Sequence, residues 1–198
     1  MKMPLLITSE KFSGENKMDE ELFHVLNSKE ERWQKRLEIS QKERKTLISI
    51  TLCLPLKYRT DQKYKELFLE FCNIYTKYCE ENGVKLKNAQ GLDGFDGPCI
   101  FYLSDSNAIE VKKISSKFEE SEKPFRIMDI DIMDENQNPI GREEIGLPPR
   151  KCFICNNSSA ACVKAKTHSK SDLEKKIKEY FLEGKEIIKN VNIFSKKY

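Results

Sequence analysis

The order of apolar and polar positions predicts helices and strands over most of the chain. The composition of residues 18–45 predicts one or two helices. The apolar positions of this segment are Phe23, Val25, Leu26, Trp33, Leu37 and Ile39. Residues 46–54 are rich in β-branched side chains and are followed by Pro55, which predicts a strand. Asp61 is a suitable N-cap for a long helix that ends at Gly83.

The middle of the chain continues with two strands, a helix and a third strand. "VKLKNAQ" and "GPCIFYLSD" are strand-like, and the glycine-rich "GLDGFDG" between them is predicted to be a loop. Ser106 is predicted to start a helix that runs to about Glu120, and "FRIMDIDIM" alternates as strands do. The order β-α-β-β-α-β predicts an α+β fold: a mixed sheet with helices on one face, as in palm-like nucleotidyltransferases, preceded by N-terminal helices.

The final third of the chain contains a turn, an irregular loop and a helix. "DENQNPIG" has turn composition, and the two prolines of "GLPPRKC" exclude regular structure. We expect a Cys/His-rich loop over residues 146–170 and a C-terminal helical segment over residues 171–198. The apolar stripe of this helix comprises Leu173, Ile177, Tyr180, Phe181 and Ile187. Residues 1–17 are predicted to be a flexible N-terminus and residues 18–198 a single domain.

Composition and charge narrow the class of protein. The chain has 198 residues, of which 35 are basic and 32 acidic, so its net charge is +3. This near balance argues against a general nucleic-acid-binding protein. The longest mostly apolar run, residues 47–56, is too short to span a bilayer, and the N-terminus has no secretory-signal pattern. Seven cysteines without an export signal indicate reduced thiols in a cytoplasmic protein.

Three aspartates stand in the apolar run "IMDIDIMD", and the last of them, Asp134, is predicted to start the turn that follows. Side chains alternate between the faces of a strand, so Asp129 and Asp131 point the same way and repel each other unless a cation lies between them. Mg²⁺ is the natural cation for such a pair and would support phosphoryl or nucleotidyl transfer. A third carboxylate for two-metal chemistry has three candidates: Glu31, Asp105 and Glu110. The alternative is an edge strand with a polar face in water.

Cysteine, histidine and basic residues gather after this strand. Cys152, Cys155, Cys162 and His168 have the spacing Cys-x2-Cys-x6-Cys-x5-His, which could form a tetrahedral zinc site. The alternative is a loop with three unrelated cysteines. Cys53, Cys72, Cys79 and Cys99 are predicted to be small core residues.

The basic residues near this cluster suit a polyphosphate ligand. They are Arg142, Arg150, Lys151, Lys164, Lys166 and Lys170, and no acidic residue lies between Arg150 and Lys170. A short basic stretch is more often a solvated surface. Here it follows the acidic strand closely, and metal-binding carboxylates beside phosphate-binding cations are what a nucleotide site needs.

The blocks "RIMDIDIMD", "IGREEIGLPPRKCFIC" and "CVKAKTH" carry a resemblance to a known family. They are similar to the apo-citrate lyase phosphoribosyl-dephospho-CoA transferases, also called citrate lyase holo-acyl-carrier-protein synthases. The matching positions are Arg126, Asp129, Asp131, Arg142, Leu147, Pro148, Pro149, Arg150, Lys151, Cys152, Cys155, Cys162, Lys166 and His168. Upstream, "SKEERWQKR" and "TLISITLCLP" resemble the start of the family pattern, and Phe125 departs from the glycine common in the family at that position.

The resemblance implies a reaction and its partners. A bacterial, cytoplasmic enzyme of this family would transfer 5-phosphoribosyl-dephospho-CoA from 2′-(5″-triphosphoribosyl)-3′-dephospho-CoA to a serine of the acyl-carrier (gamma) subunit of citrate lyase, releasing diphosphate. Asp129 and Asp131 would hold Mg²⁺, and the cations Arg126, Arg142, Arg150, Lys151 and Lys166 would bind the donor. The Cys/His cluster would hold a structural zinc or simply pack. A separate enzyme would make the donor, and neither membrane nor nucleic acid would be a partner.

Two other functions remain open from the sequence. A zinc knuckle with basic neighbours could bind nucleic acid, although few aromatic residues accompany the basic ones. An equivalent transferase for the carrier protein of malonate decarboxylase would use the same donor, but the recognised blocks fit the citrate lyase branch better.

Overall fold

The structure, a computed structural model, describes residues 17–195. The predicted flexible N-terminus lies almost entirely outside this range. The helices are α1 (Lys17–Glu43), α2 (Leu56–Arg59), α3 (Gln62–Glu81), α4 (Ala108–Ser121), α5 (Ser159–Ala165) and α6 (Lys170–Ser195), with short 3-10 helices η1 (Lys123–Ile127) and η2 (Glu143–Ile145). The strands are β1 (Thr46–Leu52), β2 (Lys87–Gly94), β3 (Gly97–Ser104), β4 (Met128–Met133) and β5 (Pro139–Ile140).

The strands form one five-stranded sheet in the order β2-β3-β1-β4-β5. The predicted α+β class and the element order β-α-β-β-α-β are confirmed, but the predicted mixed sheet is wrong because every strand pair is antiparallel. The reason lies in the connections. Each helical crossover, through α3 or α4, joins two strands of the same direction, and a strand of the opposite direction lies between them, as in a split β-α-β unit.

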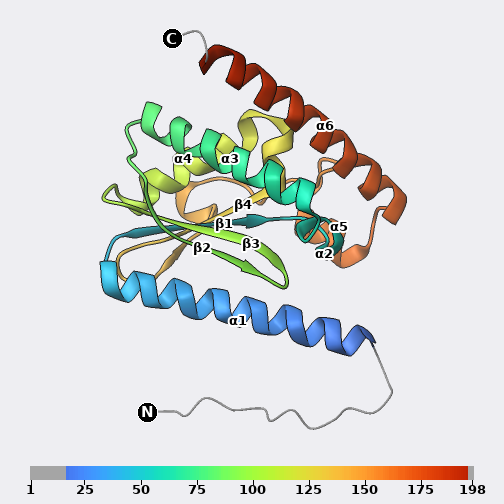
Figure 1. The fold of residues 1–198 in the computed structure, drawn as a ribbon, viewed down its shortest axis with the longest axis horizontal. Helices are drawn as coiled ribbons and strands as arrows, with labels where there is room; N and C mark the ends of the chain where they lie inside the picture. The colour runs from blue at the N-terminus through green and yellow to red at the C-terminus, as the bar shows by residue number, and fades with distance from the viewer. Residues whose placement is uncertain (1–16, 196–198) are drawn as a thin grey trace.

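Helices cover both faces of the sheet (Figure 1). The helices α3, α4 and α6 lie on one face, where the main core contains Ile48, Ile50, Phe71, Ile130 and Tyr180. The long helix α1 crosses the opposite face, where a smaller cluster joins Ile39 to Phe101 and Met133. Alternate residues of β1, β3 and β4 therefore belong to different cores.

Several predicted boundaries are confirmed and others shift. Asp61 caps α3 by accepting a hydrogen bond from the Lys63 backbone N–H, whereas Asn107 rather than Ser106 is the N-cap of α4. Most of the predicted glycine loop belongs to β2, because the β2–β3 hairpin turns tightly at residues 95–96. Gly97 has φ +106°, and a Cβ there would lie 2.8 Å from Arg59 Cβ, so both its conformation and its close contact favour glycine.

The helix α1 is attached to the hairpin by a buried ion pair as well as by Ile39, which is the one buried residue among its predicted apolar positions. Phe23, Leu26 and Trp33 are exposed. On the inward face, the guanidinium of Arg32 donates to both oxygens of Asp96 at 2.7 and 2.8 Å, and the Ser28 hydroxyl donates to Asp96 at 2.8 Å. This contact orients α1 so that the next turn reaches the aspartate strand.

The C-terminal helix is amphipathic, as predicted. Ile177 and Tyr180 are buried in the main core, and Leu173, Phe181 and Ile187 pack against it. Across the described part of the chain, none of the helices has the combination of length and hydrophobicity needed to cross a bilayer.

Candidate functional site

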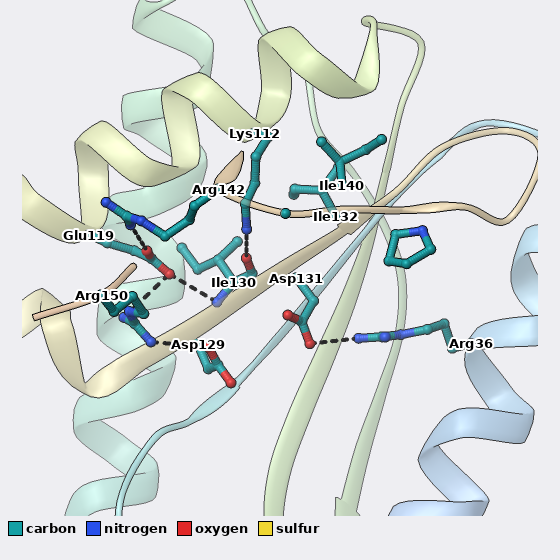
Figure 2. Close-up of a pocket in the computed structure, with 12 residues that line it drawn as sticks. Arg36, Lys112, Glu119, Asp129, Ile130, Asp131, Ile132, Ile140, Arg142 and Arg150 are labelled. Carbon is teal, nitrogen blue, oxygen red and sulfur yellow. Dashed lines mark hydrogen bonds and ion pairs between the residues drawn. The ribbon is translucent and has the colours of Figure 1, made fainter. Parts of the chain in front are cut away.

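The two aspartates of β4 share one face of the sheet, as the alternation predicts. Met128, Ile130 and Ile132 point into the main core, so Asp129 and Asp131 lie on the face that α1 crosses. Their strand neighbours on β1 are Thr51 and Ser49, which are paired with Asp129 and Asp131 respectively. The local alternation of the sequence therefore places both carboxylates at one wall of a cavity (Figure 2).

Each aspartate has an arginine partner from a different part of the chain. Arg150 Nη1 lies 3.0 Å from Asp129 Oδ1, and Arg36 Nη2, on α1, lies 3.0 Å from Asp131 Oδ2. Desolvation and the nearby charge of Asp131 together raise the pKa of Asp129. The two guanidinium groups balance the formal charge of the pair, but the two carboxylates still repel each other, and a cation bound between them would relieve that repulsion.

A buried glutamate completes the acidic wall. Glu119 of α4 is only 4% exposed, and its Oε1 accepts a hydrogen bond from the Ile130 backbone N–H at 3.1 Å. Lys112 Nζ donates to the Ile130 carbonyl at 3.0 Å. Because β5 pairs only with Ile132 and Met133, these two side chains take the place of a neighbouring strand at Ile130 (Figure 2). They hold the backbone between the two aspartates.

Glu119 was not among the predicted third carboxylates, and the predicted ones lie elsewhere. Glu31 and Glu110 are exposed, and Asp105 forms ion pairs with Lys45 and Lys87. None of the three lines the cavity of Asp129 and Asp131. One sequence signal pointed to Glu119: with Lys112 it falls on the apolar face of its helix, where a charged residue needs a partner.

Two of the predicted phosphate-binding arginines surround Glu119. Arg142 Nη1 and Arg150 Nη2 each lie 3.4 Å from this carboxylate, and a second guanidinium nitrogen of Arg142 contacts Glu120. Arg150 also donates to the Met128 carbonyl at 2.6 Å. Desolvation raises the pKa of Glu119 although Arg150 and Lys112 oppose the shift. The arginines are therefore held in place by carboxylates and carbonyls before any ligand binds.

The third predicted arginine holds the proline-rich loop. Arg126 Nη2 donates to the carbonyls of Lys151 and Cys152 at 2.6 and 2.9 Å, and its guanidinium lies 5.7 Å from the centre of the Phe153 ring. These partners are neutral, so the positive charge of Arg126 is not cancelled by them. Arg126 is predicted to be a phosphate ligand, and in the fold its side chain also holds residues 151 and 152, which follow Arg150.

Two adjacent cavities meet at these arginines. The first has a volume of about 280 Å³ and contains both aspartates, Glu119 and Arg36 in its lining. The second, of about 430 Å³, is lined by Lys123, Arg126, Lys151, Glu120 and the prolines at 148 and 149, among others. Glu119, Arg142 and Arg150 line both. Lys166, the remaining predicted donor-binding residue, is exposed at the end of α5 and lines neither cavity.

The four predicted zinc ligands come together in a group that could bind a metal. The donor atoms of Cys152, Cys155, Cys162 and His168 all lie within 4.8 Å of one another. Tetrahedral zinc with bonds of about 2.3 Å to sulfur places thiolates roughly 3.8 Å apart, and Cys155 Sγ lies 3.5 Å from Cys162 Sγ. The Nε2 atom of His168 is buried and has no hydrogen-bond partner among residues 17–195. The donor set therefore fits a metal better than a merely packed loop.

The pKa values of two of these thiols shift in opposite directions. Burial and the neighbouring Cys155 and Cys152 raise the pKa of Cys162 to about 11. Burial opposes ionisation of Cys152 as well, but backbone N–H groups of Ile154 and Cys155 lower its pKa. Outside this cluster, Cys72, Cys79 and Cys99 are buried as predicted. Cys53, which directly follows β1, is exposed, so its predicted place in the core is wrong.

The Cys/His cluster is tied to the second cavity through the chain. Lys151 and Ser158 form an antiparallel bridge, and the Cys152 N–H donates to the Asn157 carbonyl at 2.8 Å, which closes the loop of residues 152–157 that contains Cys155. Cys162 lies on α5, a helix that the sequence did not predict, which Ser158 caps through the Ala161 N–H. A metal bound to these four residues would hold residues 152–168 together directly after Arg150 and Lys151.

Comparisons with known proteins identify similar sequences. A family described as apo-citrate lyase phosphoribosyl-dephospho-CoA transferase matches residues 20–183. The protein named CitXG from Leuconostoc mesenteroides is 31% identical over 161 residues, which are 80% of this chain and 34% of that protein, so the chain spans about a third of that relative. Apo-citrate lyase phosphoribosyl-dephospho-CoA transferase from Citrobacter koseri is 25% identical over 127 residues, 64% of this chain and 69% of the relative. The same identity and coverage are found for the Escherichia coli enzyme of that name.

Proposed function

This chain belongs to the apo-citrate lyase phosphoribosyl-dephospho-CoA transferase family, and we propose that it transfers the phosphoribosyl-dephospho-CoA group to citrate lyase. The donor is 2′-(5″-triphosphoribosyl)-3′-dephospho-CoA, and the acceptor is a serine of the acyl-carrier (gamma) subunit. The observation that supports this reaction best is the cavity in which Asp129, Asp131 and Glu119 face Arg36, Arg142 and Arg150. Acidic and basic side chains in one cavity suit a phosphate ester and a metal together.

The reaction is a substitution at the α-phosphorus of the donor. The serine Oγ forms a bond to this phosphorus, the bond from the phosphorus to the bridging oxygen of the β-phosphate breaks, and diphosphate leaves. The serine proton passes to a carboxylate of the aspartate pair and then to solvent. Burial and the charge of Asp131 raise the pKa of Asp129, which favours uptake of the proton by this carboxylate.

Asp129 and Asp131 are also the residues that would hold Mg²⁺. Carboxylate oxygens on one strand face are ligands of the kind that Mg²⁺ prefers, together with substrate phosphates. When bound, Mg²⁺ would stabilise the negative charge that develops on the transferred phosphate. Glu119 and Lys112 act through the backbone, because they fix Ile130 between the two aspartates. Arg142 and Arg150, fixed by Glu119, would neutralise charge on the triphosphate, with Arg126 and Lys151 nearby.

The donor requires its own synthesis. Forming a triphosphoribosyl link on dephospho-CoA is a different class of reaction from the substitution that the cavity suits, and we propose that a separate enzyme carries it out.

The transfer can be tested directly by intact-mass spectrometry. Apo acyl-carrier subunit of citrate lyase, incubated with the purified chain, Mg²⁺ and the triphosphoribosyl donor, should gain the mass of one phosphoribosyl-dephospho-CoA group. An acceptor in which the modified serine is replaced by alanine should gain nothing. Absence of the mass gain with a folded enzyme and authentic donor, or an equal gain on the alanine acceptor, would contradict the proposed reaction.

The Cys/His cluster is proposed to bind a structural zinc ion. Three thiols and one imidazole form the ligand set of closed zinc sites, in which no position remains open for a substrate. The ligands span a loop and α5, and Arg126 holds the first of these ligands through its carbonyl. Zinc would therefore fix the segment that carries Arg150 and Lys151.

Metal analysis provides the test of this site. The purified chain is expected to contain about one zinc ion per molecule by plasma mass spectrometry, since structural zinc sites bind very tightly at neutral pH. Cys155→Ser should lose the zinc and lower the thermal unfolding temperature. Cys53→Ser, which removes an exposed thiol outside the cluster, should keep both. Equal zinc content in the two variants would show that the cluster is not the site.

A further inference from the structure

The second cavity differs in charge from the cavity of the aspartates. Its lining includes five cationic side chains, Lys123, Arg126, Arg142, Arg150 and Lys151, and two acidic ones, Glu119 and Glu120. The first cavity is nearly balanced, because four cationic side chains face Glu119, Asp129 and Asp131. The second cavity is thus the more electropositive of the two and suits a strongly anionic group.

The positive charge of the second cavity is not neutralised by its own acids. Glu119 and Glu120 are both engaged by Arg142. Arg126 bonds to backbone carbonyls, which leave its charge in place. Lys123 begins η1 and Lys151 lies on the proline-rich loop; both side chains are exposed at the cavity wall. Three cations from two separate segments therefore remain to attract an anion.

The two cavities are adjacent and share part of their lining. Arg150 contacts Asp129 at 3.0 Å in the first cavity and also lines the second. Arg142 lines both cavities as well. A phosphate chain whose first phosphorus lies next to Asp129 therefore meets cationic side chains on its way into the second cavity. Figure 2 shows Arg142 and Arg150 on either side of Glu119, and all three residues line both cavities.

From this arrangement we propose that the second cavity is a diphosphate subsite, which holds the two phosphates that leave during transfer. This inference rests on the proposed function, which supplies the triphosphate. The α-phosphorus would lie at the aspartates, and the β- and γ-phosphates would extend towards Lys123 and Lys151. When the bond between the α-phosphorus and the bridging oxygen breaks, the electron pair stays on the diphosphate, and the cations stabilise the added charge.

Dephospho-CoA contains a second diphosphate, between adenosine and pantetheine, with the same chemistry. The position of the cavity favours the leaving group, because the β-phosphate is bonded directly to the reacting α-phosphate and the shared residue Arg150 already touches Asp129. The internal diphosphate is separated from the reacting phosphorus by ribose units. A binding experiment with two ligands distinguishes these sources.

Calorimetric titration of the full chain with inorganic pyrophosphate tests the subsite without any transfer. Simultaneous Lys123→Ala and Lys151→Ala substitutions are expected to weaken pyrophosphate binding roughly tenfold or more, because charge-assisted contacts to an anion are lost. The matched control is the double variant Lys113→Ala and Lys117→Ala, which removes the same charge from exposed positions of α4 outside both linings. The control should bind within about twofold of the parent chain, apart from screened long-range effects.

Each outcome decides between alternatives. The proposal is supported if pyrophosphate binding weakens in the first double variant while dephospho-CoA binding does not change. It is overturned if the parent chain does not bind pyrophosphate, if both double variants lose affinity equally, or if only dephospho-CoA binding weakens. A failed mass gain on the carrier subunit with normal pyrophosphate binding would count against the proposed transfer and leave the subsite standing.

Discussion

Asp131→Asn is expected to lower the rate of transfer to the carrier subunit by roughly 10³-fold, because metal-assisted stabilisation of a transferring phosphate contributes several kcal/mol to the barrier. The amide keeps the size of the side chain and can no longer act as an anionic ligand. Arg36, which lies 3.0 Å from Asp131, would also lose its charged partner. Initial rates of mass gain on the carrier subunit at saturating donor measure the effect.

A variant with the same charge change elsewhere provides the control. Asp105→Asn removes an exposed carboxylate that pairs with Lys45 and Lys87, outside the lining of the first cavity. It should transfer within about twofold of the parent rate. If Asp131→Asn and Asp129→Asn both retained the parent rate, the aspartates would not hold the catalytic metal and the first cavity would not be the reaction site.

The largest effect on stability is expected at Asp96. Its side chain is 0% exposed and lies between Arg32 and Arg59, whose side chains are 18% and 19% exposed. Asp96→Asn leaves two largely buried guanidinium groups without their counter-charge, and breaking a buried ion pair in this way costs about 3 kcal/mol or more. Chemical denaturation should report this loss. Asp93→Asn, on the same hairpin but in an exposed pair with Lys65, should cost less than about 1 kcal/mol.

The pH dependence of the stability difference between the parent and Asp96→Asn tests whether the carboxylate charge causes it. Burial opposes ionisation of Asp96, but hydrogen bonds from Arg32 and Ser28 lower its pKa below the ordinary value of 3.8. A carboxylate whose pKa is lower in the folded state stabilises the fold fully above its unfolded pKa and loses that contribution as the pH falls through its folded pKa. The difference in unfolding free energy between the parent and Asp96→Asn should therefore be constant above about pH 5 and shrink as the pH falls through and below the ordinary pKa of 3.8. A gap independent of pH down to the acid unfolding range would mean that the carboxylate charge is not the cause.

Local patterns in the sequence were sufficient to predict most helices and strands and to identify two groups of site residues. The alternation of "MDIDIM" places Asp129 and Asp131 on one strand face whatever the sheet around them, because successive side chains of a strand point in opposite directions. The Cys/His spacing similarly indicated four ligands that the fold brings within 4.8 Å. The Asp61 side chain satisfies the free N–H group of Lys63 at the start of α3, an interaction between residues two positions apart.

The tertiary structure decided what depends on contacts between distant segments. Whether neighbouring strands are parallel or antiparallel depends on which strand lies between the two strands that a helix connects. A local sequence pattern does not specify this order of strands. Glu119 and Lys112 acquire their role because the edge of β4 is left open beside α4. Arg36 reaches Asp131 across 95 positions of the chain, because Asp96 fixes α1 on that face of the sheet. The roles of these charged residues depend on partners that only folding brings within hydrogen-bonding distance, so their own neighbours in the sequence could not reveal them.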